Sequence, residues 1–357
     1  MSKNKKTAAK AAARAPAKPV KKKGVSGLLI TGLAALVTVI VLWVVCPSFS
    51  GGAANIAPGN EGVWENVSAA DWMANISGSL KLSEISIPGS HDACTENVVV
   101  PVIGRCQDTD ISGQLTSGVR MLDIRLSYSG EGFTLCHGPL DCKSQPYLSA
   151  DALSFDVVLS QCREFLAAHP TETVIMMIKH ERGDASAESF EQALSAYIDE
   201  GWYTKNANPT LDEVRGKLVL ARRYGAVNDD GRLGLDFVWE DQGGSGLAAA
   251  AQLSDEKSGG FSLSVQDRYE YKAADKWGAV KACLDGPSAG SDSFSLNYLS
   301  TKGPSSFGVP EHFASVLNRL FMEKELRSGT NYGIVMFDFV TTDLARHVFA
   351  SNTYAKN

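Results

Sequence analysis

The chain of 357 residues is 44% hydrophobic, which is enough for one large buried core or two small ones. Its formal net charge of −6 is unevenly spread, because residues 1–23 hold nine lysines and arginines and no acidic residue. This leaves 25 basic against 40 acidic residues beyond them, a balance of −15 that speaks against nucleic acid as a partner.

The N-terminal region predicts a tail followed by an apolar segment. Residues 1–23 are rich in alanine and proline and show no apolar period, as in a disordered basic tail in the cytoplasm. No charged residue occurs from Gly24 to Asn60, and the apolar segment 24–47 is long enough to cross a bilayer. Because lysines 21–23 directly precede it, the positive-inside rule predicts an extracellular location for the remainder.

A cleaved secretory signal peptide is the alternative for the same segment, with the small residues at 51–55 as the cleavage region. In either case we expect export, to the cell membrane through a single-pass anchor or as a secreted protein. A Gram-positive bacterial surface fits this layout. A linker at 48–60 then leads into one domain over 61–357.

Beyond the linker, strand-like and helix-like segments alternate along the chain. Several strand candidates are continuous runs of valine, isoleucine and leucine, as in strands that are covered on both faces. Eight strands are expected, over 83–88, 119–126, 133–137, 173–180, 217–224, 261–267, 293–300 and 332–340. Helices are expected where apolar residues recur every three or four positions, over 153–169, 185–200 with Asp184 as N-cap, and 311–326.

This pattern predicts an α/β fold, a single irregular (β/α)8 TIM-type barrel preceded by the N-terminal transmembrane helix. One connection departs from the regular alternation, because only a glycine-rich turn separates residues 126 and 133. We therefore expect the barrel to lack a helix at that position.

Six cysteines lie beyond the apolar segment, an even number that favours disulfides in an exported domain. Six cysteines allow fifteen pairings, so the sequence alone does not determine the connectivity. Sequence spacing favours two close pairs and leaves a third, Cys94–Cys106, Cys136–Cys142 and Cys162–Cys283. Buried free thiols are the alternative, and no pair has the CxxC spacing of a zinc site.

Polar residues follow nearly every predicted strand at the end where a barrel keeps its catalytic groups. A random rim would not place such residues at the same end of so many strands. We expect them to share one site, formed by His91, Asp92, Asp123, Arg125, His137, Lys179, Arg223, Asp267, Tyr269 and Asp338.

Two histidines, an arginine and several carboxylates form a suitable set for cleaving a phosphodiester. A neutral imidazole removes a proton from the attacking hydroxyl, and a protonated imidazole gives one to the leaving oxygen. An arginine binds the phosphoryl oxygens and stabilises the charge that develops on them. Because Arg125 is a permanent cation that would repel a metal ion, we expect no metal and no other cofactor.

Over roughly residues 70–345 the chain resembles the bacterial phosphatidylinositol-specific phospholipase C family. The resemblance rests on motifs that occur in order and at fitting spacings, IPGSHDA, VRMLDIRL followed by LCHGPL, VIMMIKHE, GKLVLARRY and SVQDRYEY. It implies an irregular (β/α)8 barrel and a phosphatidylinositol diacylglycerol-lyase, which forms inositol 1,2-cyclic phosphate and diacylglycerol. A slower second step would open the cyclic phosphate.

The resemblance also implies the roles of the two histidines. His91 would be the general base that deprotonates the inositol 2-hydroxyl, with Asp338 orienting it. His137 would be the general acid for the diacylglycerol oxygen, paired with Asp92. The adjacent residues His91 and Asp92 would therefore serve the two ends of one reaction.

The remaining site residues would hold the phosphoryl group and the sugar. By the same resemblance, Arg125, positioned by Asp123, would stabilise the phosphoryl group. Animal relatives use calcium, with acidic residues where the bacterial enzymes have an arginine, so the arginine predicts metal independence. The residues that match the family's inositol site are Lys179, Arg223 and Asp267, with Tyr269 as the ring that stacks on the sugar.

Two alternatives to this function stay open. A glycerophosphodiester phosphodiesterase also uses a barrel and histidines, although it would need acidic metal ligands after the first strand. A barrel without activity would instead be a membrane-anchored module that binds inositol lipids. The expected partner is phosphatidylinositol or a glycosyl-phosphatidylinositol in a membrane, reached through apolar loops at 98–104 or 303–310, and we expect a monomer.

Overall fold

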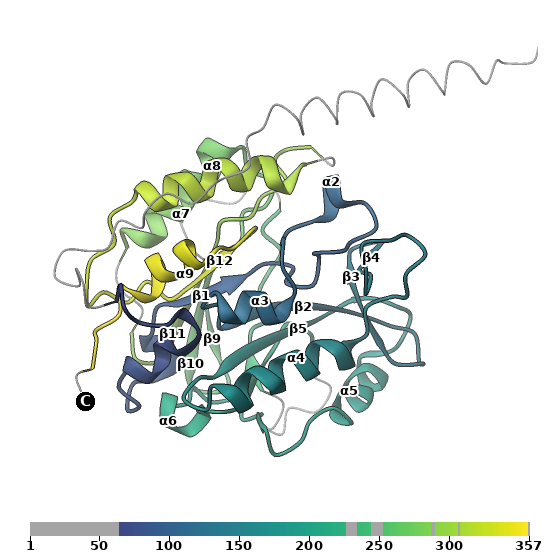
Figure 1. The fold of residues 1–357 in the computed structure, drawn as a ribbon, viewed down its shortest axis with the longest axis horizontal. Coiled ribbons are helices and arrows are strands. Elements are labelled where there is room, and N and C mark those ends of the chain that lie inside the picture. Colours follow the sequence, from purple (N-terminus) through teal and green to yellow (C-terminus); the bar gives the residue numbers. More distant parts are fainter. Residues whose placement is uncertain (1–63, 226–233, 244–252, 287–289, 306–307, 356–357) are drawn as a thin grey trace, which may run out of the picture. The chain divides into compact units, whose positions relative to one another are not determined.

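The structure is a computed structural model that describes residues 64–225, 234–243, 253–286, 290–305 and 308–355 (Figure 1). Within these residues, strands join into a curled, mixed sheet. The parallel strands of this sheet form the barrel wall, and they are β1 (Ile87–Ser90), β2 (Met121–Tyr128), β5 (Val174–Arg182), β7 (Leu218–Arg222), β8 (Leu235–Asp236), β10 (Phe261–Gln266), β11 (Ser293–Tyr298) and β12 (Ile334–Phe337).

The wall is an irregular barrel of the predicted α/β class. Its parallel strands follow the order β8, β7, β5, β2, β1, β12, β11, β10. In the part of the chain that the structure describes, no ladder joins β8 to β10, so the ring of hydrogen bonds is open there. Two further strands lie at the edges, β6 (Trp202–Tyr203) beside β7 and the antiparallel β9 (Leu253–Lys257) beside β10.

The predicted strand 133–137 exists, but it lies outside the barrel. It is β3 (Phe133–His137), which pairs antiparallel with the outer part of β2 and with β4 (Leu140–Asp141). As expected, no helix separates β2 from β3. The prediction that 133–137 is a barrel strand was therefore wrong, and the eighth strand of the wall is instead the short β8, which pairs with β7.

Helices cover the outside of the barrel (Figure 1). They are α3 (Ile111–Thr116), α4 (Phe155–Ala168), α5 (Ala187–Ser195), α6 (Leu211–Val214), α7 (Ala273–Leu284), α8 (Pro310–Glu323) and α9 (Thr342–Phe349). The short helix α2 (Pro101–Gly104) stands apart from the sheet and contacts α8. Two 3-10 helices, η1 (Ala69–Asn75) and η2 (Leu82–Glu84), precede β1. The predicted helices 153–169 and 311–326 correspond to α4 and α8.

Two predicted boundaries differ from the structure. The strand expected at 83–88 begins as η2, because Glu84 accepts a hydrogen bond from the Lys81 backbone and closes a helical turn. The helix expected at 185–200 is capped by Ser186, whose hydroxyl accepts a hydrogen bond from Ser189 N at 3.1 Å, and not by Asp184. The local capping group determines where each element begins.

Successive residues of each strand alternate between two hydrophobic clusters. On β5, Ile175 and Met177 belong to the cluster inside the barrel, whereas Val174, Met176 and Ile178 pack with residues of α4 and α5. This period of two determines which side chains face the interior. Interior positions just beyond the core therefore reach the C-terminal mouth of the barrel.

The predicted segments 1–23, 24–47 and 48–60 lie outside the described residues. Among the residues described from 64 onward, no helix combines the length and apolar character that crossing a bilayer requires. The longest helices there, α4 and α8, have 14 residues each and bury one face on the barrel. The predicted single-pass anchor thus has no support among the described residues, and the cell-membrane location drawn from it is corrected and not retained.

Candidate active site

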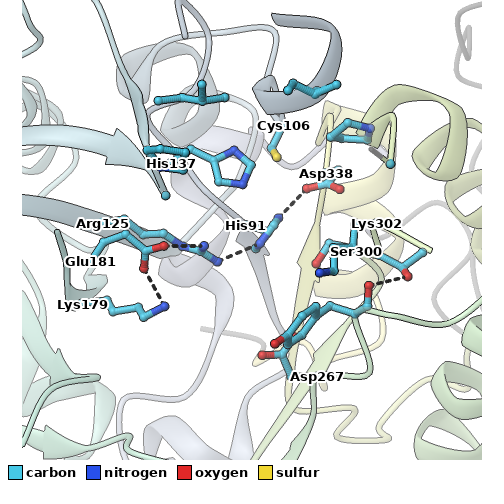
Figure 2. Close-up of a pocket in the computed structure, with 18 of the residues that line it drawn as sticks. His91, Cys106, Arg125, His137, Lys179, Glu181, Asp267, Ser300, Lys302 and Asp338 are labelled. Carbon is cyan, nitrogen blue, oxygen red and sulfur yellow. Dashed lines mark hydrogen bonds and ion pairs between the residues drawn. The ribbon is translucent and has the colours of Figure 1, made fainter. Parts of the chain in front are cut away.

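A pocket of about 440 Å³ opens at the C-terminal ends of the parallel strands (Figure 2). Asp92 and Asp123 lie buried beneath it, and each contacts Arg125. The structure thus brings the ten predicted residues into one site. The eight that line the pocket are His91, Arg125, His137, Lys179, Arg223, Asp267, Tyr269 and Asp338.

The alternation of the strands explains why these residues meet. On β2 the interior row runs from Met121 through Asp123 to Arg125. Arg125 is the register partner of Lys179 on β5, so the two cations end adjacent rows. On the other strands, the residue two positions beyond the last buried interior residue likewise lies at the mouth of the barrel. These residues are His91, Arg223, Asp267, Ser300 and Asp338.

His91 contacts two carboxylates and one guanidinium. Its Nδ1 lies 2.7 Å from Asp338 Oδ1, and its Nε2 lies 3.2 Å from Asp92 Oδ2 and 2.9 Å from Arg125 Nη2. An arginine nitrogen only donates, so Nε2 of the neutral ring is the acceptor and Nδ1–H donates to Asp338. Burial lowers the pKa of His91, but the carboxylates of Asp92 and Asp338 outweigh it and raise the pKa above its ordinary value.

Asp92 lies between the two histidines. Its Oδ2 is 3.2 Å from His91 Nε2 and 3.4 Å from His137 Nε2, and its Oδ1 is 2.8 Å from Arg125 Nε. The backbone of Asp92 has φ = 45°, a left-handed conformation that aspartate tolerates better than most residues. On its other side, His137 Nδ1 donates to the Gly104 carbonyl at 2.8 Å, so Nε2 faces the pocket.

Arg125 is the central cation of the site. Besides Asp92 and His91, it contacts Asp123 Oδ2 at 3.2 Å through Nη2 and Glu181 Oε1 at 3.7 Å through Nη1. Burial lowers the pKa of Arg125, but Asp123 and Asp92 raise it well above the ordinary value. Burial alone would raise the pKa of Asp123, but Arg125 and then Arg223 hold it well below its ordinary value. The guanidinium is therefore charged and fixed by carboxylates.

A row of paired polar side chains continues the wall of the pocket from Arg125 onward. Lys179 Nζ lies 2.6 Å from Glu181 Oε2, and Arg223 Nη2 lies 3.2 Å from Asp267 Oδ2. The Arg223 guanidinium also lies over the Trp239 ring, 3.8 Å from its centroid. This wall presents alternating donors and acceptors, as a ligand with several hydroxyl groups requires.

Tyr269 closes the wall at the pocket mouth. Its hydroxyl donates to Asp241 Oδ1 at 2.6 Å, and Lys302 Nζ lies 5.4 Å from the centroid of its ring. Burial and the hydrogen bond to Asp241 raise the pKa of Tyr269, so its phenol is neutral. Its ring is held in one orientation beside the polar wall.

One group of described residues has the spacing of metal ligands. Side-chain atoms of His91, Asp92 and Cys106 lie within 4.8 Å of one another. Arg125 is 2.8 Å from Asp92 and 2.9 Å from His91, so a fixed cation already faces these ligand atoms. The charge of the guanidinium opposes a second cation, and the set of donors does not favour a metal ion.

Comparison with known proteins agrees with this geometry. A family model described as phosphatidylinositol-specific phospholipase C, X domain, matches residues 80–224. The 1-phosphatidylinositol phosphodiesterase of Staphylococcus aureus (strain Newman) is 32% identical over 269 residues, which cover 70% of this chain and 81% of that protein. The chain belongs to the phosphatidylinositol-specific phospholipase C family. The resemblance inferred from its motifs is thereby confirmed.

Other members of the family support the fold. A variant of the phosphatidylinositol-specific phospholipase C from Staphylococcus aureus has a solved structure with a TM-score of 0.68 at 26% identity, covering 81% of this chain and 98% of that one. The phosphatidylinositol-specific phospholipase C from Listeria monocytogenes has a TM-score of 0.61 at 23% identity, covering 81% and 100%. The predicted barrel fold is therefore that of the phospholipase C family.

Sequence reasoning missed several residues of the phospholipase C site. Glu181 follows Lys179 by two positions on β5, and Ser300 follows Tyr298 on β11, so the alternation could have found both. Irregular segments, which carry no periodic signal, supply the other missed residues, namely Cys106, Gln107, Trp239 and Asp241.

The structure of this phospholipase C shows no disulfide among the six described cysteines, which corrects the predicted pairs. Cys136 pairs with Asp141 across the β3–β4 hairpin, so the side chain of the next residue, Cys142, lies on the opposite face. A short sequence spacing within a hairpin therefore places these two thiols back to back.

The other two predicted pairs are separated by the fold. Cys94 packs in a buried hydrophobic cluster, whereas Cys106 lines the active-site pocket. Cys162 lies on α4, which packs against α3 and β3, whereas Cys283 lies on α7, which packs against α8, β10 and β11 (Figure 1). Spacing along the chain does not report on these surroundings.

Proposed function

We propose that the chain cleaves phosphatidylinositol to inositol 1,2-cyclic phosphate and diacylglycerol by metal-independent acid–base catalysis. Family membership supports the substrate class. One observation carries the mechanism: the two histidines flank Asp92, with their Nε2 atoms 3.2 and 3.4 Å from its Oδ2, and Arg125 contacts the same carboxylate at 2.8 Å. Base, acid and phosphoryl-binding cation thus meet at one point.

In this proposal, His91 is the general base. Its Nε2 takes the proton from the inositol 2-hydroxyl while that oxygen forms a bond to phosphorus. The Nδ1–H bond to Asp338, at 2.7 Å, keeps the ring in the tautomer that leaves Nε2 free to accept. The imidazolium that forms is stabilised by Asp338.

His137 is the general acid, and Arg125 stabilises the phosphoryl group. As the bond from phosphorus to the glycerol oxygen breaks, Nε2–H of His137 donates its proton to that oxygen, which leaves as diacylglycerol. Arg125 donates to the phosphoryl oxygens, where negative charge increases in the transition state. Asp123, buried behind Arg125, fixes the orientation of the guanidinium.

The polar wall of the pocket binds the inositol ring. Lys179 and Arg223 donate to ring hydroxyls, Asp267 accepts from them, and the ring of Tyr269 stacks on the sugar. These groups select a polyol, because they would be left unpaired beside an apolar headgroup. We also infer that residues 61–357 act as one monomeric catalytic domain.

The test uses the full chain on vesicles that contain phosphatidylinositol, with excess EDTA, and follows the products by phosphorus NMR. The expected result is a cyclic inositol phosphate signal whose rate is unchanged by EDTA. The His91→Ala and His137→Ala variants should each lose at least about a hundredfold in kcat. A glycosyl-phosphatidylinositol offered in the same assay tests the second substrate class.

Two other outcomes of this assay would contradict the proposed function. Product that forms with calcium but not with EDTA would overturn the role of Arg125 and require a metal site. Inositol or phosphatidylinositol binding without turnover would identify a binding module instead of an enzyme.

A further inference from the structure

The segment after α2 returns to the site and runs along the ends of β1 and β12. Phe339, the residue after Asp338, donates its N–H to the Cys106 carbonyl at 2.6 Å. Phe339 has φ = 50°, a strained conformation for a bulky residue. The turn that carries Asp338 is thus held by an external contact.

Gln107 makes the most extensive contacts in this segment. Its Nε2 donates to the carbonyl oxygens of His91 and Phe337, both at 2.8 Å, and its Oε1 accepts from Val340 N at 3.2 Å. The side chain is 1% exposed. One amide therefore binds the backbone of His91 and the residues on both sides of Asp338.

This set of contacts requires the amide of glutamine. A carboxylate at the same position would face two carbonyl oxygens with acceptors alone. An apolar side chain would remove the Gln107 partner of the His91 carbonyl and of Val340 N–H, and would leave the Phe337 carbonyl with its bond from His91 N at 2.9 Å. The backbone on either side of the contact between His91 and Asp338 would then be held less firmly. The 2.7 Å contact of His91 with Asp338 depends on these two backbone ends.

We infer that Gln107 is a positioning residue for catalysis, which acts by holding His91 and Asp338 in register. The inference rests on the proposed function, in which His91 is the general base. Gln107 touches no reacting atom in that scheme. Its effect passes through the hydrogen bond that sets the tautomer and basicity of His91.

Gln114 provides a matched control in the same region. It is fully buried, and its Nε2 also bridges two carbonyl oxygens, those of Ala93 at 2.8 Å and Thr109 at 2.7 Å. Neither carbonyl belongs to His91 or to the Asp338 turn. The variants Gln107→Met and Gln114→Met therefore each remove an amide that bridges two carbonyl oxygens at similar burial, and Gln107→Met also removes the acceptor for Val340 N. Only Gln107→Met removes contacts to the backbone beside His91 and Asp338.

The test compares kcat, KM and the pH profile of kcat for these two variants and the parent chain. For Gln107→Met we expect a loss in kcat on the order of tenfold to a hundredfold, because small misplacements of a catalytic group have effects of this size. KM should change little, and the acidic limb of the profile should shift to lower pH as His91 loses its carboxylate partner. Gln114→Met should lose thermal stability but keep kcat within about threefold and the limb unchanged.

Equal kinetic losses in the two variants, or an unshifted acidic limb in Gln107→Met, would overturn the inference. If Gln107→Met does not fold, Gln107→Glu, which keeps an acceptor for Val340 N, undergoes the same measurements. The His91→Ala variant separates this result from the proposed function: full turnover without His91 would refute the function itself, whatever Gln107 does.

Discussion

At the scale of single residues, the site places a permanent cation among three carboxylates, two of them fully buried, and two imidazoles. Arg125 contacts Asp92, Asp123 and Glu181, so its charge is compensated before any substrate binds. His91 in turn lies against Asp92 and Asp338. The carboxylates therefore orient both the phosphoryl-binding group and the base, and their removal should change the pH dependence of the reaction as well as its rate.

The pH profile of kcat/KM should have an acidic limb above the ordinary histidine pKa of about 6.5. Because Asp92 and Asp338 raise the pKa of His91 against the effect of burial, more alkaline pH is needed to produce the neutral base. The Asp338→Asn variant should lower the maximal rate by about a hundredfold or more, and its acidic limb should move to lower pH. An acidic limb that stays in place in Asp338→Asn would contradict the assignment of His91 as base.

For catalysis, the several N–H donors of the Arg125 guanidinium should matter more than its positive charge alone. A lysine keeps one positive charge but cannot contact Asp92, His91 and Asp123 together, so Arg125→Lys should lower kcat by about a hundredfold to a thousandfold. The control is Arg182→Lys, since Arg182 binds Asp141 but does not line the pocket. Steady-state kinetics on phosphatidylinositol vesicles measures kcat for both variants. A similar kcat in the two variants would contradict this role of the Arg125 guanidinium.

At the scale of elements, runs of apolar residues predicted most strands of the barrel wall, while the short β8 and several helices were missed. The apolar run at 173–180 covers most of β5 and the run at 332–340 contains β12, because strands covered on both faces have few polar positions. Helix α7 was missed for a physical reason. Its buried stripe is Lys276, Val280 and Leu284, and a lysine in the stripe conceals the helical pattern.

The buried amine of Lys276 should make stability depend on pH. It donates to Gln266 Oε1 at 2.8 Å, and burial lowers its pKa to about 7. Above this value the unfolded chain holds a proton on Lys276 that the folded chain lacks, so raising the pH favours the folded state. Between pH 7.5 and 9.5 the free energy of unfolding of the parent chain should rise relative to Lys276→Met by up to about 1.4 kcal/mol per pH unit.

Urea unfolding at the two pH values measures this difference. Lys281→Met on the same helix is the control, since the Lys281 side chain is exposed and pairs with Asp285 at the surface. A parent chain whose stability changes in parallel with that of Lys276→Met would show that the amine is charged in the folded state.

At the scale of the whole molecule, the sequence predicted the strand-end residues of the site but not the loops that support them. His91, Arg125 and Asp338 end interior rows, and rows of a barrel converge at one mouth by geometry alone. Gln107 and Asp241 reach the site from irregular segments, whose path depends on tertiary contacts. The disulfide prediction failed in the same way, because sequence spacing does not report which face a cysteine occupies.

Apolar side chains beside the pocket mouth should anchor the protein at the lipid surface. Val100, Tyr147 and Leu148 are 41%, 67% and 78% exposed. They belong to two adjacent segments, joined by the bond from Lys143 N to the Asn97 carbonyl at 3.1 Å, beside the residues Ile103 and Leu140 that line the pocket. A substrate with two acyl chains requires such a surface, because the pocket takes up only its headgroup.

The double substitution of Tyr147 and Leu148 by serine should lower the fraction bound to phosphatidylinositol vesicles by about tenfold or more, because two large apolar side chains no longer leave water on binding. The same variant should hydrolyse a soluble, monomeric inositol phosphodiester at the parent rate, since neither residue lines the pocket.

Val157→Ser, at a 43% exposed position on α4, is the matched control and should leave vesicle binding unchanged. Sedimentation of vesicles measures binding. An equal loss in both variants would mean that the lipid contact lies elsewhere on the surface, and an unchanged bound fraction in the double variant would exclude this part of the rim.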